Sequence, residues 1–194
     1  MIQDEDIFSL KKSEYMVNLL DHKINFSDEL LVKLKIPKNF ETKLITLDKK
    51  NYPSQIRKSI AFISEKVEEL GYNPNIFTAL YEGILNGFQH GNNYDKDKKL
   101  TLASKITKKE LEFIISDQGN TLHSAFSRFI LEQRQKDSND SFINWYKFSG
   151  QTKPDTNNGT GTAFMHAYMD EIKYFKSAEL GGLSLYLNKK KQRA

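Results

Sequence analysis

The chain has 194 residues, of which 38% are hydrophobic and 28% charged, so it is long enough to bury the core of one domain with extensions. No apolar run approaches the roughly 20 residues of a membrane helix, and residues 1–6 include acidic groups where a secretory signal would have basic ones. The lack of cysteine excludes disulfides and thiolate metal sites. We therefore expect a cytoplasmic protein that does not contact membranes.

The net charge of +4 comes partly from the basic run at residues 189–191. No aromatic residues interleave this run, as they would in a surface that binds single-stranded nucleic acid. We expect a solvated, frayed C-terminus and no direct contact with nucleic acid.

Residues 1–40 are predicted to form an N-terminal extension that packs on the main domain or on a partner. Short helical pieces are expected around Ile7–Leu10 and Met16–Leu20, and strand-like alternation appears toward Ile36. Residues 41–194 are predicted to form the main domain.

Two amphipathic helices are predicted next. The first follows Pro53 and ends at Gly71, with an apolar stripe at spacings of four and three: Ile56, Ile60, Ile63, Val67 and Leu70. The second is expected to begin with Asn73 as the N-cap and Pro74 at the first helical position, with its apolar residues from Ile76 to Phe88 turned inward.

A β-hairpin follows, with strands at 100–106 and 111–116 joined by the polar residues 107–110. Residues 120–158 are polar and irregular, which is typical of a functional lid. A short helix after Gly161, a strand near residues 172–175, a turn at Gly181–Gly182 and a strand with alternating leucines complete the chain. This order predicts an α+β fold, a two-layer sandwich with helices on one face of a mixed, mostly antiparallel sheet.

The second helix carries the first candidate site. Glu82, Asn86 and His90 recur every four residues and should share one face. A carboxylate one turn before a carboxamide can act as a base beside an oxygen ligand for a hard cation. Taken alone, the trio also fits an ordinary solvated helix face.

Two further patterns suggest binding sites. Asp117 and Gly119 follow the apolar strand at 113–115, where a carboxylate can accept a hydrogen bond from an amino group and glycine allows close approach. Asp and Gly also form plain turns. The run Gly159, Thr160, Gly161, Thr162 opens a helix whose free N–H groups favour phosphate. A polar segment precedes it, so it is no dinucleotide fingerprint, and the chain has no Walker-type glycine–lysine loop.

In this order, the motifs resemble the histidine-kinase-type (GHKL) ATPase superfamily of gyrase, MutL and histidine kinases. Residues 79–92 are similar to the N-box of anti-sigma-factor serine/threonine kinases, residues 168–172 to the segment after their glycine box, and Arg57 stands where these relatives often carry an arginine. The resemblance covers about residues 43–187.

The resemblance implies a binding site for ATP and Mg²⁺ with a lid at about residues 120–158. Asn86 would hold Mg²⁺ and Glu82 would act as the base. Asp117 would accept the adenine amino group, Gly119 would let the base approach, and Gly159 and Gly161 would wrap the phosphates. From their placement, Thr160 and Thr162 are expected to add phosphate contacts.

The chain also departs from the family pattern. Thr121 replaces the second glycine after Asp117, Ala163 is the third small residue of the glycine box, and the lid is long. The lid aromatics at 145, 146 and 148 are expected either to cover nucleotide or a partner, or to anchor the lid locally. None of His22, His90, His123 and His166 lies in a phosphoacceptor hairpin, and His90 is interpreted as structural beside the nucleotide site.

Two functions are left open. The first is a regulatory protein kinase that phosphorylates a serine or threonine of a small antagonist protein and sequesters a sigma factor or similar client. The alternative is a catalytically weak, nucleotide-gated protein-binding module. A catalytic domain detached from a histidine kinase fits less well, because the N-terminal segment is short. Family resemblance is compatible with a homodimer, which no residue of the sequence demonstrates.

Overall fold

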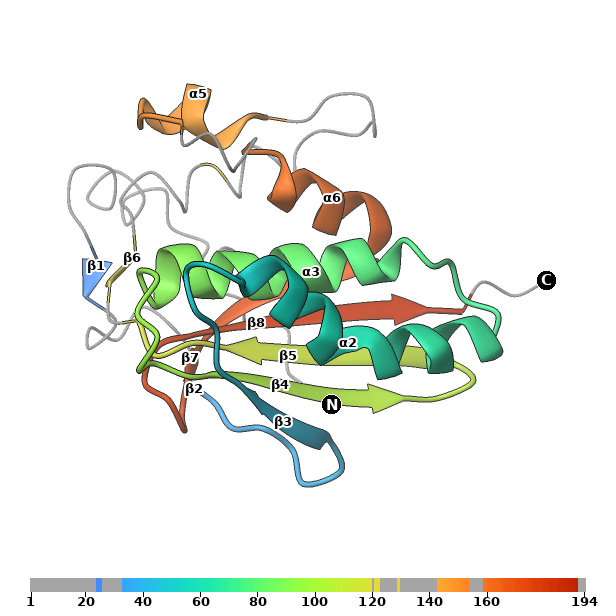
Figure 1. The fold of residues 1–194 in the computed structure, drawn as a ribbon. Coiled ribbons are helices and arrows are strands. Elements are labelled where there is room, and N and C mark those ends of the chain that lie inside the picture. Colours follow the sequence, from blue (N-terminus) through green and yellow to red (C-terminus); the bar gives the residue numbers. More distant parts are fainter. Residues whose placement is uncertain are drawn as a thin grey trace.

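The computed structural model describes residues 33–119, 143–153 and 159–191, the side chain of Phe129 and the backbone of the short paired strands β1 (Ile24–Asn25) and β6 (Thr121–Leu122). Within this part of the chain, helices cover one face of a six-stranded sheet (Figure 1). This arrangement confirms the predicted α+β two-layer fold.

The sheet is mixed and mostly antiparallel. Its strands are β2 (Lys33–Leu34), β7 (Glu171–Ser177), β8 (Leu183–Lys190), β5 (Glu110–Ser116), β4 (Leu100–Ile106) and β3 (Glu41–Ile45), in that spatial order. Only β2 and β7 run parallel, and every other pair is antiparallel. The predicted hairpin is confirmed as β4 and β5, and the alternating leucines lie on β8.

The main core lies between the sheet and the helices α2 (Tyr52–Glu69), α3 (Ile76–Asn86) and α6 (Gly161–Tyr168). On α2, the predicted stripe of Ile56, Ile60, Ile63 and Val67 is fully buried, and Gly71 ends this helical segment with a φ of +69°. α3 contacts both α2 and α6, so it lies at the centre of the helical layer (Figure 1).

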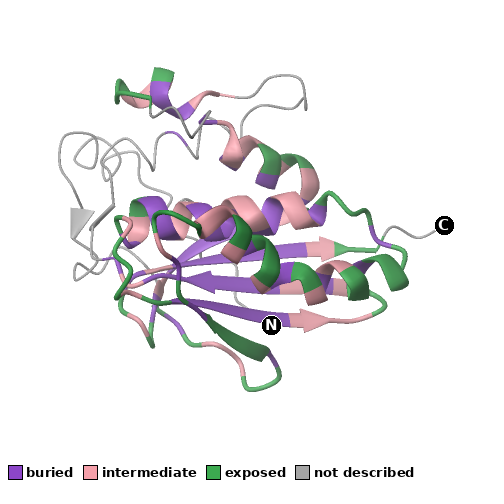
Figure 2. Ribbon diagram, viewed as in Figure 1, coloured by how far each residue is buried: buried purple, intermediate pink, exposed green. Residues whose placement is uncertain are grey.

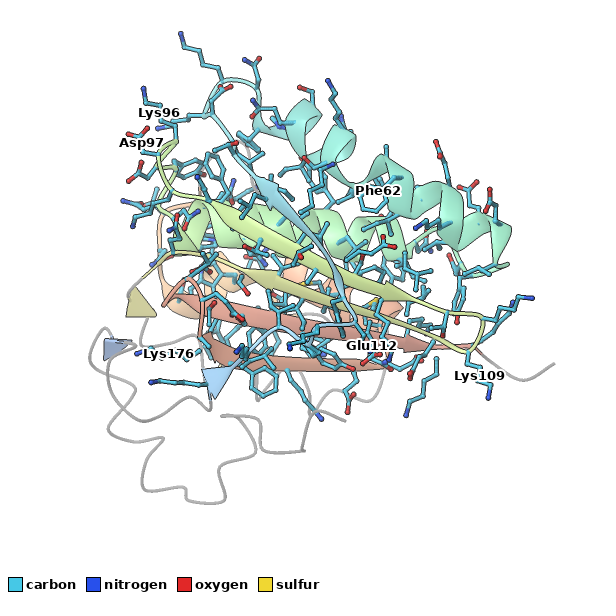
Figure 3. The ribbon with its side chains drawn as sticks, turned by 90° about the horizontal axis from the view of Figure 1, so that it is seen from below. Phe62, Lys96, Asp97, Lys109, Glu112 and Lys176 are labelled. Atoms are coloured by element: carbon cyan, nitrogen blue, oxygen red, sulfur yellow. The ribbon has the colours of Figure 1, made fainter. Side chains whose placement is uncertain are left out.

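The second face of the sheet is covered by the segment between β2 and β3, which we call the strap (residues 35–40). β2 and β3 form opposite edges of the sheet, so the strap passes beneath the strands between them (Figure 3). A small apolar cluster joins the strap and β2 to the strands above: Leu34, Ile36, Phe40, Ala103, Ile114, Phe175 and Tyr186. This part of the N-terminal extension therefore packs on the main domain.

Three local predictions are corrected or fall outside the described residues. α3 begins at Ile76, because the Asn73 side chain accepts a hydrogen bond from Asn75 N–H (2.9 Å) in a turn that precedes the helix. The basic run is not frayed: it ends β8, where Asp170 accepts hydrogen bonds from Lys189 Nζ and Lys190 N–H. The helical pieces expected before residue 21 lie outside the described residues.

No helix in the described part of the chain combines the length and apolar character required to cross a bilayer.

Candidate functional site

Helix α3 lies unusually close to the sheet beside the first candidate residue. A Cβ added at Gly83 would come 2.7 Å from Ile115 Cδ1 and 3.0 Å from Leu185 Cδ2. The lack of a side chain at Gly83 therefore allows α3 to pack closely on β5 and β8. The neighbouring Glu82 is half-buried. Burial raises the pKa of the Glu82 carboxyl above its ordinary value, because the charged form loses hydration.

Asn86 ends α3 one turn after Glu82 and is also half-buried. The same helix continues into the π-helical segment η2 (Gly87–Gly91), in which Asn92 N–H donates to Gly87 C=O (2.7 Å). Such π-turns are rare and frequently lie at functional sites. Because a π-turn widens the helix, His90 does not simply extend the line from Glu82 to Asn86, and it is exposed.

Asp117 follows β5 and is buried, with 4% of its surface exposed. Its Oδ1 accepts hydrogen bonds from the N–H groups of Gly119 (2.8 Å) and Leu183 (3.1 Å), and its own N–H donates to Leu183 C=O (2.9 Å). Burial raises the pKa of Asp117 to about 6, although these two N–H donors and the charge of Lys98 partly oppose the shift.

Three glycines surround this carboxylate, and we call them the glycine cage: Gly91, Gly119 and Gly182. A Cβ at Gly91 would overlap the Asp117 carboxyl group, and one at Gly182 would overlap both its backbone oxygen and Oδ1. At Gly119, a Cβ would overlap the Gly91 carbonyl. The small size of these glycines therefore lets η2 and the turn before β8 lie in direct contact with Asp117. The hydrogen bonds from Gly119 and Leu183 both end on Oδ1.

Asn92 fixes the loop that follows Asp117. Its side chain is buried, its Oδ1 accepts from Gln118 N–H (2.8 Å), and its Nδ2 donates to Lys99 C=O (3.2 Å). The next two residues, Asn93 and Tyr94, have φ values of +54° and +59°, a conformation that is strained for a bulky side chain. Tyr94 is held there by aromatic contacts with Tyr52 and Phe88.

The glycine box begins α6 next to Glu82. A Cβ at Gly161 would overlap the Glu82 carboxylate, so the N-terminus of α6 lies directly against that group. The N-cap, Thr160, makes no side-chain capping bond, and no acidic residue lies in the first turn. Thr162 is buried. The N–H groups at this helix end favour an anion, and the carboxylate that lies against them in the structure is that of Glu82.

Helix α5 (Trp145–Ser149) lies in the described part of the lid, and it packs on the glycine box. Trp145 N–H donates to Gly159 C=O (2.9 Å), and Gly159, with a φ of +69°, leaves room for the Tyr146 ring that a Cβ would meet at 2.7 Å. Trp145 also contacts Phe129 edge-on, with ring centroids 5.1 Å apart. Of the two roles expected for the lid aromatics, this packing favours the local anchor.

Arg57 and the histidines lie as follows. The Arg57 guanidinium sits 5.7 Å from the ring centroid of Tyr81, the residue before Glu82. His166 is half-buried on α6 and His90 is exposed in η2, whereas His22 and His123 fall outside the described residues. Within the described residues, no group of three or more His, Asp and Glu side chains could hold a metal ion by itself.

The structure thus gathers the predicted residues around one helix. On α3, Glu82 contacts Gly161, the first residue of α6. Gly87 and Gly91, which approach Asp117, lie five to nine residues after Glu82, or about 8–14 Å along a helix. A Mg²⁺ site built from the Asn86 amide oxygen, with Glu82 nearby, fits the known preference of this ion for few protein oxygens completed by phosphate and water. A purine amino group fits the chemistry of a buried acceptor carboxylate flanked by glycine backbone.

Sequence reasoning missed several residues of this site. Gly182 was expected only as a turn, and Gly83, Gly87, Gly91 and Asn92 only as parts of a motif. Gly91 and Asn92 lie within the N-box-like segment at residues 79–92, where a glycine next to a small amide residue was the available sign of close packing. No such signal marked Gly182, because its role depends on the pairing of β5 with β8.

Comparison of the chain with protein-family models and with curated proteins gives no match.

Proposed function

We propose that this protein binds ATP with Mg²⁺ and acts as a regulatory protein serine/threonine kinase of the anti-sigma-factor type. The observation that carries the proposal is the buried Asp117 carboxylate in its glycine cage, at one end of the helix that presents Glu82 to the N-terminus of α6. An acceptor for a base and an anion-attracting helix end, joined by one rigid helix, suit a nucleotide.

The chain's own groups divide the work of phosphoryl transfer, which depends mainly on position and charge. Asp117 would select a base with an amino group, and the N–H groups at the start of α6 would receive phosphate oxygens. Glu82 would accept the proton from the acceptor hydroxyl, a role favoured by its raised pKa. Asn86 would hold Mg²⁺, which neutralises phosphate charge when bound.

Calorimetry with ATP, in the presence and absence of Mg²⁺, tests the binding site. We expect Asp117→Asn to abolish binding and Asn86→Ala to remove its dependence on Mg²⁺. Asp97→Asn is the matched control, since Asp97 is exposed on the loop before β4 (Figure 3) and should bind as wild type does. A folded wild-type protein that does not bind ATP would refute the proposal.

Transfer of labelled phosphate to candidate antagonist proteins tests the kinase activity. Glu82→Gln keeps the size of the side chain and should retain ATP binding while losing transfer. If wild type transfers to no candidate yet binds ATP, the kinase assignment loses its support and the second candidate is preferred.

A nucleotide-gated binding module is that second candidate, and the contact between Gly159 and α5 favours it. Because the phosphate-binding end touches Tyr146 and Trp145, a nucleotide that displaces Gly159 must also move the lid helix. Trp145 is the sole tryptophan, so its fluorescence reports on α5. No change of fluorescence upon saturation with ATP would contradict gating through this contact.

A further inference from the structure

Helix α6 begins with backbone donors that its own first turn does not satisfy. The N–H group of Phe164 is the first to donate within the helix, to Thr160 C=O (3.2 Å), so those of residues 161–163 have no partner inside it. The Thr160 side chain does not cap them, and the first turn contains no acidic residue. The positive end of the helix dipole therefore has no negative group of its own on α6.

The negative group at this helix end comes from a different helix, α3. A Cβ added at Gly161 would overlap Glu82 Oε2 and lie 3.0 Å from Glu82 Cδ, so the carboxylate itself lies against the first residue of α6. One turn further along, Met165 Sδ would lie 3.7 Å from a Cβ added at Gly83, the residue after Glu82. α6 is exposed on its outer side and buried on the side that faces α3 (Figure 2). The packing of the two helices therefore places the carboxylate at the start of α6.

The Glu82 carboxylate is held at Gly161 by this packing alone. Among the described residues, no hydrogen bond or ion pair fixes it, and the loss of hydration on burial is the cause of its raised pKa. The Arg57 guanidinium lies over the ring of the preceding residue, Tyr81. A phosphate group can accept several hydrogen bonds from the N–H groups of a helix start, so it can replace a carboxylate that accepts none.

We propose that Glu82 and the phosphates of the nucleotide compete for the N-terminus of α6, so that the proposed base rests against Gly161 until phosphate displaces it. The inference rests on the proposed function, which places the phosphates at this helix end. Glu82 can leave Gly161 by rotation of its side chain, without movement of either helix. A nucleotide would then deliver the phosphoryl group and release the base in one event, whereas a nucleoside without phosphate would leave the base at rest.

Calorimetry with three ligands, at a fixed Mg²⁺ concentration, tests the competition. Glu82→Gln removes the charge and keeps the size of the side chain, so its affinity for ATP and for inorganic tripolyphosphate should exceed that of wild type about three- to tenfold. Adenosine carries no phosphate and should bind both proteins equally. Glu65→Gln makes the same exchange at an exposed position of α2, and this control should bind all three ligands as wild type does.

Salt separates a contact from long-range repulsion between Glu82 and phosphate. A half-buried contact is screened little, so the ratio of the two affinities should be the same at about 0.1 M and about 0.5 M NaCl. A ratio that falls to one at the higher salt concentration would overturn the inference. A wild-type protein that binds ATP with an affinity that Glu82→Gln does not exceed would overturn the inference alone. A wild-type protein that binds neither ATP nor tripolyphosphate would refute the proposed function and, with it, the inference.

Discussion

Replacement of Asp117 by asparagine should stabilise the protein while destroying the proposed adenine contact. Asparagine has the same shape, so it fits the glycine cage, and its amide oxygen can still accept from Gly119 and Leu183 N–H. What disappears is a buried negative charge. The amide group also presents a donor where the adenine amino group would need an acceptor.

The size of the effect follows from the pKa of Asp117, which is about 6 in the folded protein against an ordinary value of 3.8. This difference corresponds to about 3 kcal/mol. Folding raises this pKa, so the folded protein holds the proton more tightly than the unfolded chain. The contribution of this group to the free energy of unfolding therefore falls as the pH rises from about 4 to about 6, and it stays low above that. We expect Asp117→Asn to be more stable than wild type by up to about 3 kcal/mol at pH 7.5, and by about half as much at pH 5.

Urea denaturation followed by far-UV circular dichroism measures both values, with Asp97→Asn as the exposed control that should match wild type at each pH. A variant less stable than wild type at pH 7.5 would show that the carboxylate is stabilised in its cage rather than strained by burial. An equal gain at pH 5 and 7.5 would equally refute the reasoning, because the pH dependence is its signature.

Three further substitutions follow from the packing. Gly91→Ala places a Cβ where it overlaps the Asp117 carboxyl group, so the free energy of unfolding should fall by about 2 kcal/mol and ATP binding should be lost. An unchanged urea midpoint would contradict this. Asn92→Ala leaves Gln118 N–H and Lys99 C=O without their partner, at about 1–3 kcal/mol in the same denaturation assay, and a smaller loss would mean that water replaces the side chain. Trp145→Ala removes the lid anchor, so limited proteolysis should cut the lid faster while the urea midpoint shifts less than for the other two; an unchanged cleavage rate would show that Trp145 does not hold the lid.

The parts of the fold that local patterns specify were predictable. The stripe on α2 and the alternation in β4 and β5 depend on neighbours within one element, and both were predicted within one or two residues. The motifs around Glu82 and Asp117 were also visible as local patterns, and the structure places them on one helix and at its end. Their roles in nucleotide binding stay predictions.

Features that depend on distant partners were not predictable. The two apolar residues of β3, Leu44 and Ile45, are adjacent, so its sequence shows no strand-like alternation, and its pairing with β4 decides its conformation. The sequence predicts a solvated tail at Lys189 and Lys190. In the structure, these residues continue β8 alongside β5, and Asp170 accepts hydrogen bonds from both. The beginning of α3 shifted because the Asn73 side chain formed a turn of its own.

The strap beneath the sheet limits how flat the sheet can be. Five strand spacings separate β2 from β3, or about 24 Å in a flat sheet, and the seven residue steps from Leu34 to Glu41 span about the same length when fully extended. This stretch is not fully extended, because Phe40 N–H donates to Pro37 C=O (3.1 Å) in a turn. The two edges of the sheet must therefore bend toward each other. Flattening the sheet would require the turn at Pro37 to open or β2 to separate from β7, so the six-residue strap limits the curvature of the sheet on which α3 packs.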